Sequence, residues 1–462
     1  MKSSCLHVWA ILALLPIAAM PARAQSRDDK LVTRFMQKHH VPGLAFVILR
    51  DGSVVNHGTY GVANTATKER ITNTSVFPIA SLSKPFVALG VLWLAERNRV
   101  DLNLPVGKYL PNLPATWKTI PLVRLLDHTS GVPDHYNAGK WNVLDPTPIS
   151  SDELIEKLTT LPLEFQRGEK FQYSNGNYAL LAKVIEMVSG EPYEEFLDRQ
   201  VFKPLGMTHT RVLHQEDLTK IVHGYESTPD GMQDAPWNPD WCYGNGAIGA
   251  TWPDLARLDA GLYTERIVKF STLTFITSPQ PLSDGSKPGY AMGWMIGKSR
   301  QADTISHSGR LDGWCSYFVR YPKYNLTVAI LSNNGSANLN TLGADLAGTE
   351  VDDLALDPAP DQNPGLTQNH LKFVQAIMNG NLDEGWLNGP MKNDFESKDH
   401  WVSIGKDLTA GGEITLFEPV TRDQVNANEM RTRYRLEQGD RVRSVTIGCN
   451  PQGQVSYLYF TS

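Results

Sequence analysis

Near the start of the chain, the pattern of apolar and polar positions predicts one helix followed by one β-hairpin. Apolar residues recur at helical spacing over residues 28–40 and give that segment one apolar side. Two runs typical of strands, 44–49 and 54–59, are separated by Asp51-Gly52, which is a strong hairpin signal. We therefore expect two antiparallel strands to follow directly on a short helix.

The pattern predicts further helices and strands up to residue 356. Residues 150–161 and 177–188 are amphipathic, and a third helix begins at Trp252. The other regular segments are four strands and a closing helix, at 290–296, 304–308, 314–321, 326–331 and 340–356. This order predicts the α/β class, with an antiparallel sheet flanked by helices. We expect the early hairpin to pair beside the late strands, and the long insertion to form a helical subdomain over one end of the sheet.

A stretch rich in proline and asparagine divides the chain near residue 360. Residues 358–365 have the composition of a linker. Beyond it, one helix and four alternating segments typical of strands follow, at 369–378, 413–417, 431–436, 442–447 and 455–460. We therefore predict a main domain at 25–357 and a small α+β accessory domain at 366–462.

One short stretch combines a helix start with a candidate nucleophile. Ser81 and Lys84 are three residues apart, so on a helix their side chains point the same way, one turn apart. Pro85 is tolerated in a first turn, which places the helix start at about Ser81 or Leu82. Residues 85–95 are apolar all round, as in a helix buried in a core, and are too few to span a bilayer. A serine beside a lysine at the mouth of such a helix is a candidate nucleophile with its base.

The Ser-x-x-Lys spacing has little specificity by itself. It occurs again at Ser403-Ile404-Gly405-Lys406, where a glycine lies inside and no apolar helix follows, so we interpret this match as chance. Taken alone, Ser81 is also a common helix N-cap residue. There is no Gly-x-Ser-x-Gly nucleophile elbow. A Ser-His-Asp triad assembled from scattered residues stays open at this point.

The N-terminal segment and the charge restrict the compartment and the partners. Residues 1–24 are typical of a secretory signal peptide, with Lys2 at the start, an apolar core and the cleavage site Ala22-Arg23-Ala24. A non-cleaved anchor is the alternative. Removing residues 1–24 takes away two basic residues and no acidic one, which changes the formal charge from −6 to −8. This balance argues against nucleic acid and anionic membrane surfaces as partners. We expect a periplasmic or secreted protein with no stable membrane span after cleavage.

Cysteine and histidine residues do not predict a metal site. Cys242, Cys315 and Cys449 remain after the leader, which allows at most one disulfide. There is no His-Glu-x-x-His motif or comparable ligand spacing. We expect neither a metal nor another cofactor, so the core must hold the fold together.

Three short motifs, supported by their order and flanks, carry a resemblance to a known family. The motifs are Ser81-x-x-Lys84, Tyr173-Ser174-Asn175 and His307-Ser308-Gly309, and further landmarks lie at 125–131, 204–207 and 292–294. They resemble the signature elements of the class C β-lactamase and penicillin-binding-protein superfamily of serine hydrolases, over about residues 28–355. A second Tyr-x-Asn lies at Tyr243-Gly244-Asn245. We prefer the first because it directly precedes a capped helix, the context that the family uses.

The resemblance implies roles for these residues. Ser81 would attack a carbonyl and form an acyl-enzyme. Lys84 would be the base if burial lowers its pKa, or Tyr173 if nearby cations lower the pKa of its phenol, and both assignments stay open. Asn175 would orient the substrate amide or Lys84. By family analogy, the backbone N–H groups of Ser81 and Arg310 would form the oxyanion hole.

The third motif departs from the commonest family pattern, which has Lys-Thr-Gly where this chain has His307, Ser308 and Gly309. An unperturbed histidine titrates near pH 6.5, so His307 would bind a substrate carboxylate only toward acidic pH, with Arg310 as the next cation to consider. The resemblance with this departure implies hydrolysis of esters, D-amino-acid peptides or amides as small-molecule or peptide substrates. The alternatives are a weak β-lactamase, a D,D-carboxypeptidase, or a non-catalytic protein that binds cell-wall peptide. The oligomeric state stays open.

Overall fold

A computed structural model describes residues 26–136, 145–228, 231–300, 302–393, 398–439 and 441–461. The predicted signal peptide lies outside these ranges. Within them, no helix combines the length and the hydropathy that crossing a membrane requires. The three cysteines of this part of the chain, Cys242, Cys315 and Cys449, are buried free thiols.

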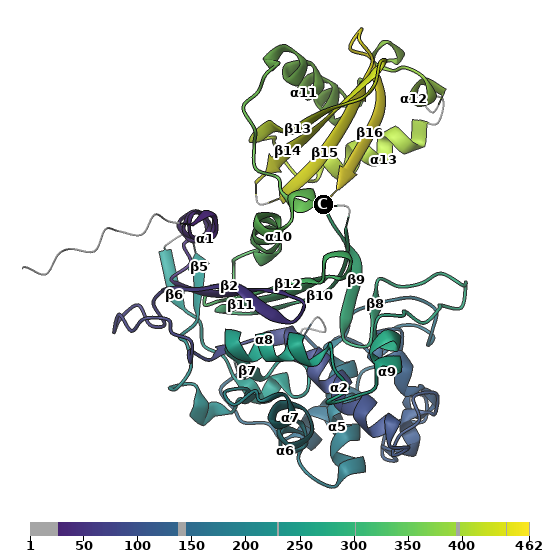
Figure 1. The fold of residues 1–462 in the computed structure, drawn as a ribbon. Coiled ribbons are helices and arrows are strands. Elements are labelled where there is room, and N and C mark those ends of the chain that lie inside the picture. The colour runs from purple at the N-terminus through teal and green to yellow at the C-terminus, as the bar shows by residue number, and fades with distance from the viewer. Residues whose placement is uncertain are drawn as a thin grey trace, which may run out of the picture.

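An antiparallel sheet of seven strands forms the centre of the main domain, in the order β2-β1-β12-β11-β10-β9-β8 (Figure 1). Its strands are β1 (Gly43–Arg50), β2 (Ser53–Gly61), β8 (Tyr290–Ala291), β9 (Trp294–Ser299), β10 (Ala302–Leu311), β11 (Trp314–Tyr321) and β12 (Leu326–Ser332). The first hairpin turns at Asp51 and Gly52, both with φ near +50 to +70°, as a two-residue hairpin loop requires. β1 pairs with β12 in a register that places Leu44 opposite Ser332. The predicted pairing of the early hairpin beside the late strands is confirmed.

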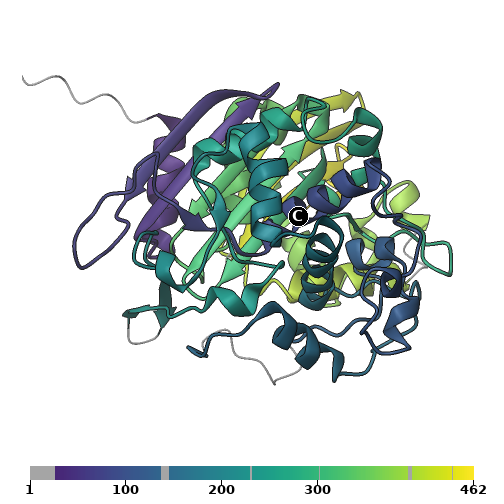
Figure 2. The ribbon, with the colours of Figure 1, turned by 90° about the horizontal axis from the view of Figure 1, so that it is seen from below.

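Helices cover both faces of this sheet. α1 (Arg27–Lys38) and α10 (Leu339–Glu350) lie on one face over a core that includes Phe46, Val328 and Ile330. The helical subdomain lies against the other face, as the view from below shows (Figure 2). Its helices are α2 (Lys84–Glu96), α3 (Leu122–Leu126), α4 (Ser151–Thr159), α5 (Asn175–Ser189), α6 (Tyr193–Leu197), α7 (Lys203–Leu205), α8 (Trp252–Gly261) and α9 (Phe270–Ile276).

Short strands complete the main domain. β3 (Phe77–Pro78), β7 (Ile248–Ala250) and β4 (Arg211–Val212) make a small sheet, and β5 (Tyr225–Thr228) pairs with β6 (Gly231–Asp234). The predicted strand 290–296 is interrupted, because Met292 and Gly293 have φ of +42° and +92° and separate β8 from β9. The predicted closing helix ends at Glu350 instead of 356, and a 3₁₀ turn at Asp352–Leu354 follows it.

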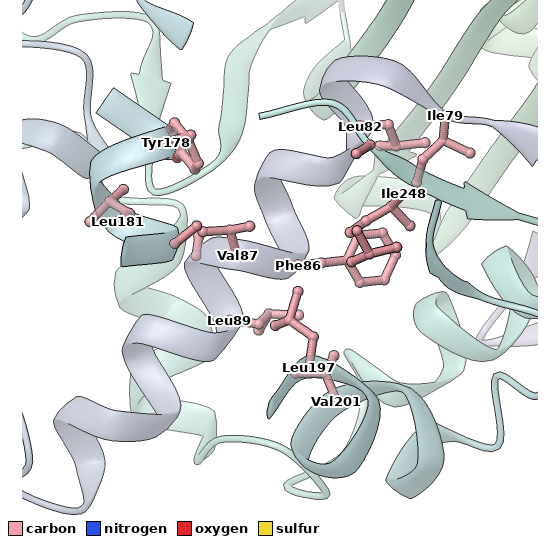
Figure 3. Packing of buried hydrophobic residues seen from close by; sticks show 14 of the residues in the cluster. Ile79, Leu82, Phe86, Val87, Leu89, Tyr178, Leu181, Leu197, Val201 and Ile248 are labelled. Atoms are coloured by element: carbon pink, nitrogen blue, oxygen red, sulfur yellow. The ribbon is translucent and has the colours of Figure 1, made fainter. Parts of the chain in front are cut away.

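The helix α2 is buried on all sides, as its uniformly apolar sequence predicts. Figure 3 shows Val87 beside Leu181 of α5, and Leu89 beside Leu197. A 3₁₀ turn at Ala80–Ser83 precedes α2, and Pro85 occupies its first turn, where a missing N–H costs no hydrogen bond. The core therefore holds the N-terminus of α2 rigidly, with Ser81 and Lys84 at its mouth.

The C-terminal module is a separate sheet domain. Its antiparallel strands are β13 (Leu416–Asn426), β14 (Glu429–Gln438), β15 (Arg441–Cys449) and β16 (Val455–Thr461), and its helices are α11 (Pro364–Met378), α12 (Pro390–Asn393) and α13 (Lys398–Thr409). It lies beyond α10, on the side of the main sheet opposite the helical subdomain (Figure 1). Arg435 bonds Asp345 of α10 at 3.0 Å, and the Arg433 guanidinium donates to the Asp353 carbonyl at 2.9 Å. The module therefore packs away from the mouth of α2.

Candidate active site

The turn that carries Ser81 is fixed between α2 and the strand β10. Ala80 has φ of +50°, a conformation that costs a non-glycine residue free energy and persists only where the surroundings impose it. The Ile79 carbonyl accepts a hydrogen bond from the Ser316 hydroxyl at 2.7 Å. A Cβ on Gly309 would lie 2.0 Å from that same carbonyl oxygen. Only glycine at this position lets β10 approach the turn that carries Ser81 so closely.

The amine of Lys84 is the centre of the site. It is completely buried, and its Nζ lies 2.9 Å from Ser81 Oγ, 2.8 Å from Asn175 Oδ1 and 2.9 Å from the Asn245 carbonyl oxygen. Burial lowers the pKa of Lys84 from its ordinary value of 10.5 to about 7. A neutral amine has two N–H donors and one lone pair. Because the two asparagine oxygens can only accept, they occupy both donors and leave the lone pair for the Ser81 hydroxyl proton.

The phenol of Tyr173 completes the surroundings of Ser81. Its side chain hydrogen-bonds that of Ser81, and its ring centre lies 4.9 Å from Lys84 Nζ. The expectation that nearby cations lower its pKa is wrong: burial is the largest influence and raises the pKa of Tyr173 well above the ordinary value. Tyr173 therefore stays protonated at neutral pH, whereas the amine of Lys84 is partly deprotonated there.

His128, to which the sequence pattern assigned no role, holds Tyr173 in place. Its backbone carbonyl accepts from Gln172 N at 3.0 Å, and its Nδ1 accepts from Ser174 N at 3.1 Å. The imidazole ring also packs against the Tyr173 ring, with 4.3 Å between the centres. One residue thus binds the backbone on both sides of Tyr173. The His-Thr-Ser-Gly landmark was visible in the sequence, but its contact with this segment was not.

Both Tyr-x-Asn motifs reach Lys84, although by different atoms. Asn175 does so through its side chain, at the first turn of α5, and Asn245 through its backbone carbonyl. The ring of Tyr243, by contrast, packs against Tyr193 with 4.8 Å between the centres. The structure therefore brings Tyr173 and Asn175 to Ser81, and it uses the second motif as a backbone acceptor.

Strand alternation divides the third motif between the two faces of the sheet. Paired residues of antiparallel strands place their side chains on the same face. His307 pairs with Phe318, in the core shared with the helical subdomain. Ser308 pairs with Tyr317, and Arg310 with Cys315, both in the core beneath α10. The side chains of Ser308 and Arg310 therefore point away from Ser81, and only their backbone can face it.

His307 is buried and fully hydrogen-bonded. Its Nδ1 lies 2.6 Å from the Ser308 carbonyl oxygen, and its Nε2 lies 3.0 Å from the Tyr290 hydroxyl. Because a carbonyl can only accept, Nδ1 carries the proton and Nε2 accepts from Tyr290. Burial lowers the pKa of His307 to about 3. The expected titration near pH 6.5 is therefore wrong, and the imidazole is neutral throughout the physiological range.

The second Ser-x-x-Lys match lies elsewhere in the molecule. Ser403 and Lys406 are exposed on α13 of the C-terminal module. The sequence pattern did not predict this helix. Its position on the far side of the main sheet agrees with interpreting the match as chance.

An antiparallel sheet with a helical subdomain, and a serine beside a buried lysine where they meet, define the β-lactamase and penicillin-binding-protein class of serine hydrolases. A family model described as Beta-lactamase matches residues 29–348, and the chain belongs to this family. It is 30% identical over 329 residues to penicillin-binding protein 4* of Bacillus subtilis (strain 168), a match that covers 67% of this chain and 72% of that protein. The chain spans 64 to 72% of the length of the curated relatives it matches.

Solved structures share the fold at lower identity. The D-amino acid amidase from Ochrobactrum anthropi SV3, complexed with D-phenylalanine, is 22% identical with a TM-score of 0.61, covering 71% of this chain and 98% of that one. The octameric penicillin-binding protein homologue from Pyrococcus abyssi is 19% identical with a TM-score of 0.63, covering 94% of this chain and 99% of that one. The second likeness extends over the C-terminal module as well as the main domain.

Proposed function

We propose that the protein is a serine hydrolase that acts through an acyl-enzyme on Ser81, with Lys84 as the general base. The contact geometry of Lys84 carries this proposal, because two carbonyl oxygens occupy its N–H groups and leave the lone pair for the Ser81 hydroxyl. A pKa of about 7 makes the free amine available near neutral pH. The same geometry favours catalysis over a purely peptide-binding role, which needs no deprotonated lysine.

The steps of the reaction follow from these positions. Lys84 takes the hydroxyl proton while Ser81 Oγ attacks the substrate carbonyl. The backbone N–H groups of Ser81 and Arg310 stabilise the oxyanion, an assignment supported by the close approach of β10 at Gly309. Tyr173, which stays protonated and bonds Ser81, passes a proton to the leaving group and regains one from the Lys84 ammonium. Water then hydrolyses the acyl-enzyme by the reverse proton path.

The surroundings of His307 favour a substrate that has no carboxylate beside the third motif. His307 is neutral with both ring nitrogens engaged, and the side chain of Arg310 lies on the opposite face of the sheet. Neutral esters and amides therefore fit better than β-lactams or peptides with a free C-terminus. The amidase complexed with D-phenylalanine makes D-amino-acid amides a first class to test. A location outside the cytoplasm, from the predicted leader, belongs to the same proposal.

A fluorophosphonate probe tests the proposal directly. Wild-type protein should be labelled on Ser81, located by mass spectrometry of the peptide, and Ser81→Ala should abolish both labelling and the turnover of p-nitrophenyl acetate and D-phenylalanine amide. Ser403→Ala is the matched control and should behave like the wild type. Turnover of the β-lactam nitrocefin should be at least about tenfold slower than that of the neutral ester, roughly 1.4 kcal/mol in the barrier. Label on a residue other than Ser81 would refute the assignment.

A further inference from the structure

The amide of Asn175 lies between the Lys84 amine and a buried carboxylate, that of Asp134. Asn175 Nδ2 is 3.2 Å from Asp134 Oδ1 and 3.3 Å from Oδ2, while its Oδ1 is 2.8 Å from Lys84 Nζ. We propose that Asp134 is a positioning residue that orients the Asn175 amide toward Lys84 and places a negative charge beside the general base. The inference rests on the proposed function, because it concerns the same base.

The chemistry of the two neighbours allows only one orientation of the Asn175 amide. A carboxylate accepts hydrogen bonds, so it must face the NH₂ group. The carbonyl oxygen then faces Lys84, where it occupies an N–H donor. If the amide were rotated by half a turn, its oxygen would face the carboxylate and its NH₂ would face the amine. Among the described residues, Asp134 is the acceptor that faces the NH₂ group of Asn175. Without it, the rotated amide would compete for the lone pair of Lys84.

The loop that carries Asp134 is bound tightly to the start of α5. The Ser174 hydroxyl donates to the Pro133 carbonyl at 2.9 Å, and Ser130 Oγ lies 2.5 Å from Asn177 Oδ1. A Cβ on Gly176 would lie 2.9 Å from the Pro133 oxygen, so the loop passes as close to the helix as glycine allows. Asp134 is itself buried, with 7% of its surface exposed. The carboxylate is therefore held in place.

Within the described residues, the other titratable groups that interact with Lys84 or with Asp134 are neutral near pH 7. Burial lowers the pKa values of His128, His135 and His307, and it raises those of Tyr173, Tyr178, Tyr136 and Cys242. Burial also lowers the pKa of Lys84, while Asp134 acts in the opposite direction. The negative charge of Asp134 thus keeps the pKa of Lys84 from falling further, and removal of that charge should lower the pKa of Lys84.

Two substitutions separate the orienting effect from the charge. Asp134→Asn keeps an oxygen that accepts from Asn175 and removes only the charge. It should move the midpoint of the pH dependence of fluorophosphonate labelling down by about one pH unit, and it should lower the plateau rate by no more than about threefold, because a base of lower pKa is a weaker base. Asp134→Ala removes the acceptor too and should lower the plateau by about tenfold. In an Asn175→Ala background, Asp134→Ala should lower the plateau no further, because the group it orients is gone. Asp254→Asn removes a different buried carboxylate and should leave the midpoint unchanged.

The titration of Lys84 can also be measured without any reaction. In protein labelled with [ε-¹³C]lysine, the Lys84 resonance is identified by its absence from Lys84→Met, and its midpoint should fall in Asp134→Asn. The inference would be overturned by an unchanged or higher midpoint in Asp134→Asn. It would also be overturned if the plateau labelling rate of the double variant Asp134→Ala, Asn175→Ala fell by the product of the two single losses. Absence of label from wild-type Ser81 would instead overturn the proposed function, and the resonance would still decide the role of Asp134.

Discussion

Replacing Lys84 by methionine should abolish acylation and yet stabilise the fold at neutral pH. The lowering of its pKa from 10.5 to about 7 corresponds to about 5 kcal/mol that the buried ammonium costs the folded state. Methionine has a similar shape and no charge, but it leaves the two asparagine oxygens without a donor and the Ser81 hydroxyl without its acceptor, at about 1 kcal/mol for each of the three lost hydrogen bonds. The net expectation is that the free energy of unfolding rises by about 2 kcal/mol at pH 7.

The pH dependence of this difference has a definite sign. Below pH 7, Lys84 is protonated in both the folded and the unfolded chain, so its full cost is present. Between about pH 7 and 10.5, the unfolded chain binds one proton that the folded chain does not, and wild-type stability rises by about 1.4 kcal/mol per pH unit from this group. Lys84→Met lacks this contribution. The two proteins should therefore become equally stable near pH 8.5 (roughly, from the same slope).

Urea unfolding, monitored by tryptophan fluorescence, measures the difference in the free energy of unfolding between Lys84→Met and the wild type. Measurements at pH 6.5, 7.5 and 8.5, about one unit apart, follow the slope. Ser81→Ala is the matched control, because it keeps Lys84 and should show the wild-type pH dependence. A Lys84→Met protein that is less stable than the wild type at every pH, or whose stability runs parallel to it, would refute the idea that the amine is held in the folded state against a large burial cost.

Two further predictions concern the surroundings of the site. His128→Asn should keep at least about a third of the wild-type labelling rate, because the asparagine oxygen can replace Nδ1 as an acceptor and asparagine tolerates the φ of +56° at this position. His128→Gln should lower the labelling rate by at least about tenfold. Equal rates for the two variants would contradict the role of Nδ1. Limited proteolysis should cut first at the exposed residues 357–360. A chain ending at Asp357 should be labelled within about threefold of the wild-type rate, and a folded truncate without labelling would show that the C-terminal module shapes the site.

Much of the fold was predictable because local patterns decided it. Strand alternation and the Asp51-Gly52 turn defined the first hairpin, and the uniformly apolar segment after Ser81 defined the buried helix. The helix α13 was missed because its apolar positions, such as Trp401 and Leu408, are few and a glycine lies among them. The interruption between β8 and β9 was missed because the left-handed conformation of Met292 is imposed by its surroundings, including a hydrogen bond from its N–H to Asp127 at 3.0 Å.

The candidate site was predictable only as far as its motifs reach. Ser81, Lys84, Tyr173 and Asn175 do meet, as their resemblance to a family implied. The partners that set their protonation and orientation, Asp134 among them, come from a loop whose contacts are long-range in sequence. The pKa values predicted for His307 and Tyr173 were wrong for a related reason. Burial determines it, and burial depends on neighbours that the chain supplies from distant segments.

The pairing of β1 with β12 has a consequence for biosynthesis. Leu44 and its partner Ser332 are separated by 288 positions, so at roughly 5–20 residues per second a ribosome needs about 15 to 60 s to supply the partner strand. During that time β1, of which every residue but the last is buried in the finished protein, has nothing to pair with except its own hairpin. An unpaired apolar strand is prone to aggregation. Production of this protein should therefore depend on chaperones that bind the nascent N-terminal segment until the last strand of the sheet arrives.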